Sequence, residues 1–187
     1  MVGFTRRLSF KQYIKGKPTP WGIKIWCLAE SETGYLLNFH VYIGKDEAAS
    51  AHGQGYDVVM SMVQPYLGNK HVVFFDNFFS SPHLALDLLR KDTYCCGAIR
   101  PNRKGWPYPK SKQRKGEAKT KQSGLIVATQ WTDKRQINVI STSSNPTMAT
   151  VSRRTKAGPV NVEIPQPVHD YNSGMFGVDL NDQHRSY

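Results

Sequence analysis

The sequence lacks several features that define specialised classes of protein. It holds only three cysteines in 187 residues, Cys27, Cys95 and Cys96, and none of them forms a Cys-x-x-Cys spacing. This number and spacing argue against a disulfide framework and against structural zinc. No apolar run approaches the roughly 20 residues that cross a bilayer, and residues 1–7 lack the apolar stretch of a signal peptide. We therefore expect an intracellular protein with no membrane partner and no zinc.

Nucleotide-cofactor motifs are absent as well. The chain contains no Gly-x-Gly-x-x-Gly pattern and no phosphate-loop pattern. An unrelated α/β domain acting on a small molecule is therefore the weakest of the hypotheses considered, and we expect no small-molecule substrate.

Acidic residues are missing from two stretches in which basic residues gather. Residues 1–24 carry six Lys or Arg and no acid, and residues 100–121 carry nine Lys or Arg and one acid, Glu117. The net charge is +11, so the rest of the chain is mildly acidic. Solvated loops would explain one basic stretch, but two beside an acidic remainder favour a polyanion such as DNA.

The hydrophobic pattern predicts an α/β domain with helices packed on a sheet. Ser81 followed by Pro82 predicts a helix start, because serine caps a helix and proline fits its first position. Pro65 should end the helix before it. The expected elements are strands over 21–29 and 35–43 that form a hairpin, a helix over 57–67, a central strand over 72–75, a helix after Ser81 and a strand over 94–100.

The second half of the chain has a weaker pattern. Residues 101–124 are rich in basic residues, proline and glycine, which predicts an exposed loop. Residues 125–131 and 136–142 predict a hairpin, and residues 143–167 predict irregular structure. Residues 175–187 resemble the start of a helix.

Carboxylates are the candidate chemical groups. Asp76 directly follows the apolar strand over 72–75, at the end of a strand where ligands gather in open α/β sheets. Asp179 and Asp182 are three residues apart, which places both on one face of a helix. Each also has a purely structural explanation: Asp76 can begin a turn, and the other two can complement a helix dipole.

Together these acids fit chemistry on a phosphodiester. Two Mg²⁺ ions about 4 Å apart can activate the attacking oxygen and stabilise the leaving one. Carboxylates from separate elements hold such ions, while water and substrate phosphate complete the coordination. Asp76 and Asp179 are the predicted ligands, with Asp182 as a further candidate.

Short motifs in this order resemble the piggyBac-type transposases and their domesticated, transposable element-derived relatives. They span nearly the whole chain. The matching segments are Ser9-Phe10-Lys11-Gln12-Tyr13, Lys17-Pro18, Trp21-Gly22-Ile23-Lys24, Phe75-Asp76-Asn77-Phe78-Phe79-Ser80-Ser81, Cys96-Gly97-Ala98-Ile99-Arg100, Asn102-Arg103-Lys104-Gly105, Tyr171-Asn172 and Gly177-Val178-Asp179-Leu180-Asn181-Asp182-Gln183.

The resemblance implies a fold, an activity and a set of site residues. The fold would be α/β, a ribonuclease-H-like mixed sheet flanked by helices, with a β-rich insertion before the last acidic motif. Residues 1–100 would belong to the core, residues 101–167 would form the basic loop and insertion, and residues 168–187 would begin the final acidic helix.

The implied activity is metal-dependent DNA cleavage and strand transfer, with excision at element ends and integration at TTAA targets. Asp76 and Asp179 would be catalytic, and both would bind Mg²⁺ or Mn²⁺ together with Asp182. DNA phosphates would be contacted by basic residues that position the duplex rather than read its sequence. These are Arg100, Arg103, Lys104, Lys110, Lys112, Arg114 and Lys115.

The chain departs from the family pattern at its start. The family's first catalytic Asp precedes the Ser-Phe-Lys-Gln-Tyr segment, whereas here no Asp or Glu occurs before Glu30, and Arg6 stands where glycine is usual. We therefore expect a fragment of a catalytic core that is inactive alone. The alternative is a domesticated nuclear module that binds DNA without cutting it. Both readings take DNA as the partner and leave a homodimer open.

Overall fold

The computed structural model describes residues 1–16, 19–44, 50–109, 113–156 and 158–184. The chain forms two compact units. Unit 1 contains Met1–Gln64 and Phe176–Tyr187, and unit 2 contains Pro65–Met175. The mixed α/β class predicted from the sequence is confirmed. No helix in the described ranges has the length and apolar character needed to cross a membrane.

Unit 1 consists of two small antiparallel sheets and two helices. The strand predicted over 21–29 is divided at Lys24 between the two sheets, and the predicted hairpin is confirmed. The first sheet has the order β1-β3-β2 and the second pairs β4 with β5. The elements are β1 (Val2–Gly3), β2 (Gln12–Tyr13), β3 (Trp21–Ile23), β4 (Ile25–Ala29), β5 (Leu36–Val41), α1 (Gln54–Val63) and α4 (Gly177–His184).

The helix α1 packs on the β4–β5 hairpin through a buried apolar face. Val59, Met62 and Val63 are buried, and the Asn38 side-chain amide on β5 donates to the Met62 carbonyl at 3.1 Å. The helix ends before Pro65, which lies in the 3-10 turn η1 (Gln64–Tyr66). This agrees with the predicted stop, because proline has no N–H to continue the helical hydrogen bonds.

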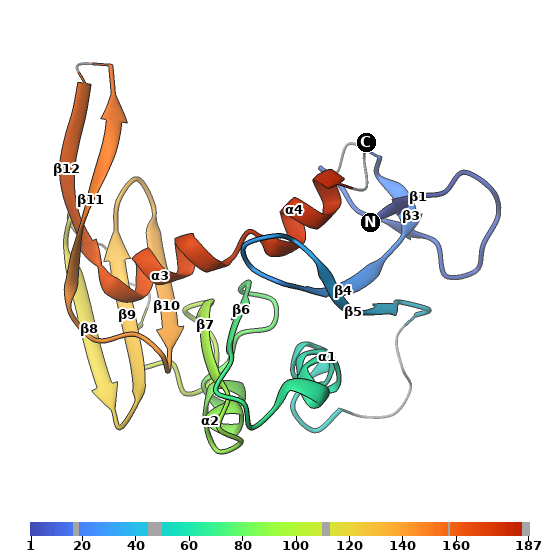
Figure 1. Ribbon diagram of the computed structural model, residues 1–187, viewed down its shortest axis with the longest axis horizontal. Helices are drawn as coiled ribbons and strands as arrows, with labels where there is room; N and C mark the ends of the chain where they lie inside the picture. Colours follow the sequence, from blue (N-terminus) through green and yellow to red (C-terminus); the bar gives the residue numbers. More distant parts are fainter. Residues whose placement is uncertain (17–18, 45–49, 110–112, 157, 185–187) are drawn as a thin grey trace. The chain divides into compact units, whose positions relative to one another are not determined.

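Unit 2 is built on one five-stranded sheet of order β6-β7-β10-β9-β8 (Figure 1). The β6 and β7 strands are parallel, and the other neighbours are antiparallel. A separate hairpin pairs β11 with β12. The elements are β6 (Val72–Phe75), α2 (Pro82–Leu89), β7 (Tyr94–Ala98), β8 (Ala118–Ser123), β9 (Ile126–Thr132), β10 (Gln136–Ser141), β11 (Met148–Thr155), β12 (Gly158–Pro165) and α3 (Gln166–Gly174).

Two helices cover this sheet. The helix α2 begins at the predicted cap, where the Ser81 side chain accepts the Leu84 N–H at 3.1 Å. Its buried face packs on β7. The helix α3 runs across β7, β9 and β10 (Figure 1). The core between α3 and the strands contains Cys96, Trp131, Val139, Ile164, Val168 and Tyr171.

Several sequence predictions for unit 2 are wrong. Part of the predicted loop over 101–124 is the strand β8, and the predicted irregular segment over 143–167 contains β11 and β12. The strand β8 is largely exposed and polar, so it lacks the apolar signal used to predict strands. The strand β12 does carry that signal, because Val160, Val162 and Ile164 alternate with polar residues, and the prediction missed it. Pro159 and Pro165 lie in a two-stranded sheet, where an edge strand tolerates a missing donor. The strand β6, predicted to be central, is at an edge of the sheet as described.

Strand pairing joins residues on both sides of the predicted domain boundary at residue 100. The strand β10, from the predicted insertion, pairs with β7, from the predicted core, with Val139 opposite Ala98. The two compact units also divide the chain near residues 64 and 175. The boundaries at residues 100 and 167 stay a prediction.

Gly97 allows β7 to lie against the β6 strand end. It pairs with Phe75 across the parallel β6–β7 ladder, and a Cβ at this position would overlap the Phe75 ring. A Gly97→Ala substitution must therefore displace the ring that precedes Asp76. We expect a loss of stability on the order of 1–3 kcal/mol, as for other overpacked cores, measured by urea unfolding.

The matched test is the double variant Gly97→Ala/Phe75→Leu. Leucine removes the ring that the new methyl group meets, although the Phe75 carbonyl oxygen stays 2.8 Å from it. The two substitutions together should therefore cost less than the sum of their separate effects, with part of the Gly97→Ala loss remaining. Additive losses would contradict the proposed contact.

Candidate functional site

Asp76 lies at the exposed end of β6, in a tight turn. Its Oδ1 accepts the Phe78 N–H at 2.7 Å, and its backbone carbonyl accepts the Ser80 hydroxyl at 2.9 Å. This is an Asx-type turn, in which the side chain imitates a backbone acceptor. The turn interpretation of Asp76 is therefore correct, and the turn also fixes the direction of the carboxylate.

Two arginines from the segment after β7 hold the same turn. The Arg100 Nε donates to the Asn77 side-chain oxygen at 3.0 Å. The Arg103 Nη2 donates to the carbonyls of Asn77 at 3.2 Å and Phe78 at 2.5 Å. A guanidinium bound to two carbonyls restricts the loop more than a single neutral hydrogen bond would. These contacts connect residues 77–78 to a segment more than twenty residues later in the chain.

The acids of α4 lie in unit 1. Asp179 is exposed in the first turn of the helix, and Asp182, one turn later, is half-buried. The Asp182 Oδ2 lies 3.7 Å from the Met1 nitrogen. The predicted helical placement of both acids is confirmed within this unit.

The start of α4 is fixed against the β4–β5 turn. A Cβ at Gly177 would lie 2.5 Å from the Glu30 carbonyl oxygen, so only glycine allows this approach. The Asn181 amide donates to the Gly34 carbonyl at 3.1 Å. The turn itself is closed by the Glu30 carboxylate, whose pKa is lowered by hydrogen bonds from the Thr33 hydroxyl and from the Thr33 and Glu32 N–H groups.

The ligand chemistry of these acids suits a hard cation. Asp76, Asp179 and Asp182 offer carboxylate oxygens, which Mg²⁺ and Mn²⁺ prefer. No group of three or more His, Cys, Asp or Glu side chains that could hold a metal was found among the described residues. The carboxylates therefore fit the cation in kind, and their joint binding of it stays a prediction.

The predicted DNA-binding residues have different surroundings. Arg100, Lys104, Arg114 and Lys115 are exposed. Arg103 is half-buried, because its guanidinium is directed at the Asp76 turn. Lys110 and Lys112 lie outside the described residues.

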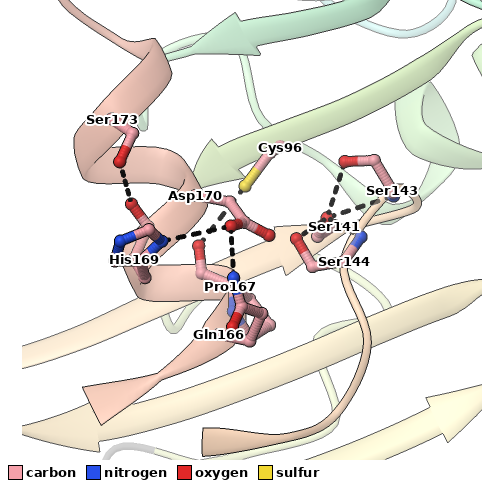
Figure 2. A network of polar contacts seen from close by, with 9 residues as sticks. All are labelled: Cys96, Ser141, Ser143, Ser144, Gln166, Pro167, His169, Asp170 and Ser173. Carbon is pink, nitrogen blue, oxygen red and sulfur yellow. Dashed lines mark hydrogen bonds and ion pairs between the residues drawn. The ribbon is translucent and has the colours of Figure 1, made fainter. Parts of the chain in front are cut away.

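Polar contacts lie in α3 and between α3 and the sheet (Figure 2). The Cys96 thiol donates to the Pro167 carbonyl at 3.5 Å, and the Asp170 carboxylate accepts the Gln166 amide at 2.6 Å. Beside them, the buried Ser141 hydroxyl accepts the Ser144 N–H at 3.1 Å and lies 2.9 Å from the Ser144 hydroxyl. These hydrogen bonds satisfy the polar groups of Cys96, Ser141 and Ser144, which are buried.

Sequence reasoning assigned no role to Asn77 or Asn181. Both belong to the motifs quoted above, but a motif does not reveal which amide makes a hydrogen bond to a distant loop. The sequence did offer a signal, because Asn77 is next to Asp76 and Asn181 is two residues after Asp179, and both acids are predicted metal ligands.

Comparisons with known proteins agree with the motifs. A family model described as Transposase IS4 matches residues 1–187. Human piggyBac transposable element-derived protein 3 is 28% identical over 98% of this chain and 33% of its own length. Human piggyBac transposable element-derived protein 2 is 28% identical over 92% of this chain and 32% of its own length. The chain therefore spans about a third of the length of these curated relatives.

A solved structure is similar to this chain over nearly its whole length. It is the cryo-EM structure of a piggyBac transposase synaptic complex with hairpin DNA, with a TM-score of 0.81 and 26% sequence identity. The match covers 98% of this chain and 38% of the transposase chain.

Loss of the Arg103 side chain should loosen the Asp76 turn. The Phe79 and Ser80 N–H groups donate to the Asp76 carbonyl, so they report on this turn. We expect Arg103→Ala to speed hydrogen exchange at these two amides, with a local cost on the order of 1–3 kcal/mol. Lys104→Ala, at the exposed neighbour, should leave the exchange unchanged. Equal rates in both variants would contradict the positioning role.

The two buried cysteines should make the fold sensitive to alkali. Burial raises the pKa of Cys95 and of Cys96 to about 12, above the ordinary thiol value of about 8.5. Between these values the unfolded chain loses thiol protons that the folded chain keeps, so stability falls as the pH rises. At pH 10 we expect a loss on the order of 2 kcal/mol per thiol relative to pH 7, measured by urea unfolding.

The control is Cys95→Ala/Cys96→Ala, in which this part of the pH dependence should disappear. Iodoacetamide should label Cys27, which is only half-buried, before the other two. Rapid labelling of Cys95 or Cys96 in the folded chain would show that the thiols are not protected.

Proposed function

Because this chain belongs to the Transposase IS4 family, we propose that it forms part of the catalytic core of a piggyBac-like DNA transposase. In this proposal the core is ribonuclease-H-like, and the activity is metal-dependent DNA cleavage and strand transfer in the nucleus. Residues 101–167 are its β-rich insertion.

The observation that carries the proposal is the state of Asp76. Its carboxylate is exposed at the carboxyl end of β6, which is parallel to β7. This is the edge where open α/β sheets gather their functional groups. The Asx turn and Arg103 fix the carboxylate without covering it. The two arginines bind Asn77 and Phe78, the residues that follow Asp76, and so hold the turn from outside the carboxylate.

Asp76 and Asp179 would hold Mg²⁺ or Mn²⁺, with Asp182 as a third ligand. The cation, when bound, would activate the attacking oxygen and stabilise the leaving one. The chain's own part would be to present the carboxylates in fixed directions. Asp76 is fixed by its turn, and Asp179 by the contacts of Gly177 and Asn181 with the β4–β5 turn.

DNA would be held by the exposed cations of the segment after β7. Arg100 and Lys104 lie in this segment, and Arg114 and Lys115 follow. They would bind phosphates and so position the duplex. Arg103 would act differently, by keeping the Asp76 turn in place. The similar piggyBac transposase was solved in a synaptic complex with hairpin DNA, which supports DNA as the partner class.

Divalent-ion binding tests the role of the carboxylates directly. We expect Asp76→Asn and Asp179→Asn each to weaken Mn²⁺ binding by roughly tenfold or more, because a neutral amide replaces a charged ligand. Electron paramagnetic resonance of Mn²⁺ measures the affinity. Asp92→Asn is the matched control, since Asp92 is exposed and its positive φ of 47° suits asparagine.

Unchanged Mn²⁺ affinity in both variants would overturn the metal proposal. Cleavage of a duplex with transposon-like ends then separates the two functions considered. A transposase core within its full-length protein cuts in Mg²⁺ and loses cutting with Asp179→Asn. A module that only binds DNA retains salt-sensitive binding and does not cut.

A further inference from the structure

Two aromatic side chains form an exposed pair on the first sheet of unit 1. Tyr13 on β2 and Trp21 on β3 are directly opposite each other. Their ring centroids are 5.0 Å apart with an interplanar angle of 53°. Tyr13 is 55% exposed and Trp21 is 50% exposed. About half of each side chain is therefore open to solvent.

A lysine lies over the same pair. The Lys11 Nζ is 5.3 Å from the centroid of the Trp21 ring, and it also donates to the Arg6 carbonyl at 3.2 Å. That hydrogen bond holds the ammonium group near the ring. We call Lys11, Tyr13 and Trp21 the aromatic platform.

The charge around the platform is of one sign. Arg6, Arg7 and Lys15 are exposed in the same segment of the chain, and residues 1–24 contain no Asp or Glu. An open aromatic surface alone would fit an apolar peptide equally well. The surrounding cations select a ligand that combines flat rings with negative charge, which is the chemistry of a nucleotide strand.

A structural role alone does not account for the exposure. Cross-strand aromatic pairs do stabilise sheets, and the strands here are only two and three residues long. That role requires the two rings to meet each other, as they do. It does not require the rest of both rings to stay open beside a cation.

We propose that the aromatic platform binds unpaired nucleotides of a DNA strand, with a base stacked on Trp21 or Tyr13 and the backbone phosphates near Lys11 and its basic neighbours. Bases within a duplex are covered on both faces, so only unpaired or displaced bases can stack in this way. The inference rests on the proposed function in taking DNA as the partner. It adds a site for single-stranded DNA that is made by residues of unit 1.

The experiment compares three labelled DNA ligands by fluorescence anisotropy at low salt, using the whole chain. They are a short thymidine strand, a strand of the same length with abasic sites in place of bases, and a duplex. The abasic strand keeps the phosphates and removes the rings. Stacking therefore appears as the preference for the thymidine strand over the abasic one.

We expect Trp21→Ala to weaken thymidine-strand binding by roughly tenfold and to abolish this preference. Trp21→Phe should retain most of it, because phenylalanine still offers a ring. Tyr35→Ala is the matched control: Tyr35 is 71% exposed on the same unit, and its loss should change nothing. Lys11→Ala should weaken binding of the thymidine and abasic strands alike.

A fluorescence measurement on the wild type tests the same stacking contact without depending on the folding of a variant. Trp21 is the most exposed of the four tryptophans, so a stacked thymidine should quench the emission more than the abasic strand does. Trp21→Phe should remove that difference.

Two results would overturn the proposal: equal binding of the thymidine and abasic strands by the wild type, or a preference that survives Trp21→Ala. Failure of the proposed function is a different result. In that case duplex binding or Mn²⁺ binding is absent while the Trp21-dependent preference for unpaired bases is present.

Discussion

Close contacts that only glycine permits determine where both candidate acids lie. In unit 2 the missing side chain of Gly97 leaves room for the Phe75 ring, and Asp76 is the next residue after that ring. In unit 1 the missing side chain of Gly177 lets α4 begin against the Glu30 carbonyl, two residues before Asp179. Each acid is thus within two residues of a point where the backbone has no freedom to shift. Packing therefore sets the backbone position of each acid, and at Asp76 the hydrogen bond from the Phe78 N–H then sets the direction of the carboxylate.

The part of this arrangement that could be predicted from sequence is the part with local signals. Ser81 and Pro82 mark the start of α2 because a cap and a first-turn proline act on their own neighbours. The β4–β5 and β9–β10 hairpins were predicted for the same reason, since short turns join strands of apolar residues. The acidic motifs were recognised as motifs. Their placement on a strand end and on the first turn of a helix then agreed with the structure.

The part that could not be predicted depends on neighbours far away in the chain. The strand β8 is exposed and polar, and what makes it a strand is its pairing with β9. Arg103 illustrates the same limit for a single side chain. From sequence it is one cation in a basic stretch, and only the fold shows that two carbonyls of the Asp76 turn accept its hydrogen bonds. Its positive charge predicts an acceptor for its hydrogen bonds. That the acceptors are the carbonyls of Asn77 and Phe78 depends on where the fold places the Asp76 turn.

Unit 1 is assembled from both ends of the chain, with all of unit 2 between them. The Asn181 amide that fixes α4 reaches a carbonyl 147 residues earlier, at Gly34. During synthesis from the N-terminus, unit 2 has all its residues once Met175 has left the ribosome, whereas the β4–β5 turn must wait for α4. The β4–β5 turn is therefore made long before the helix that it holds.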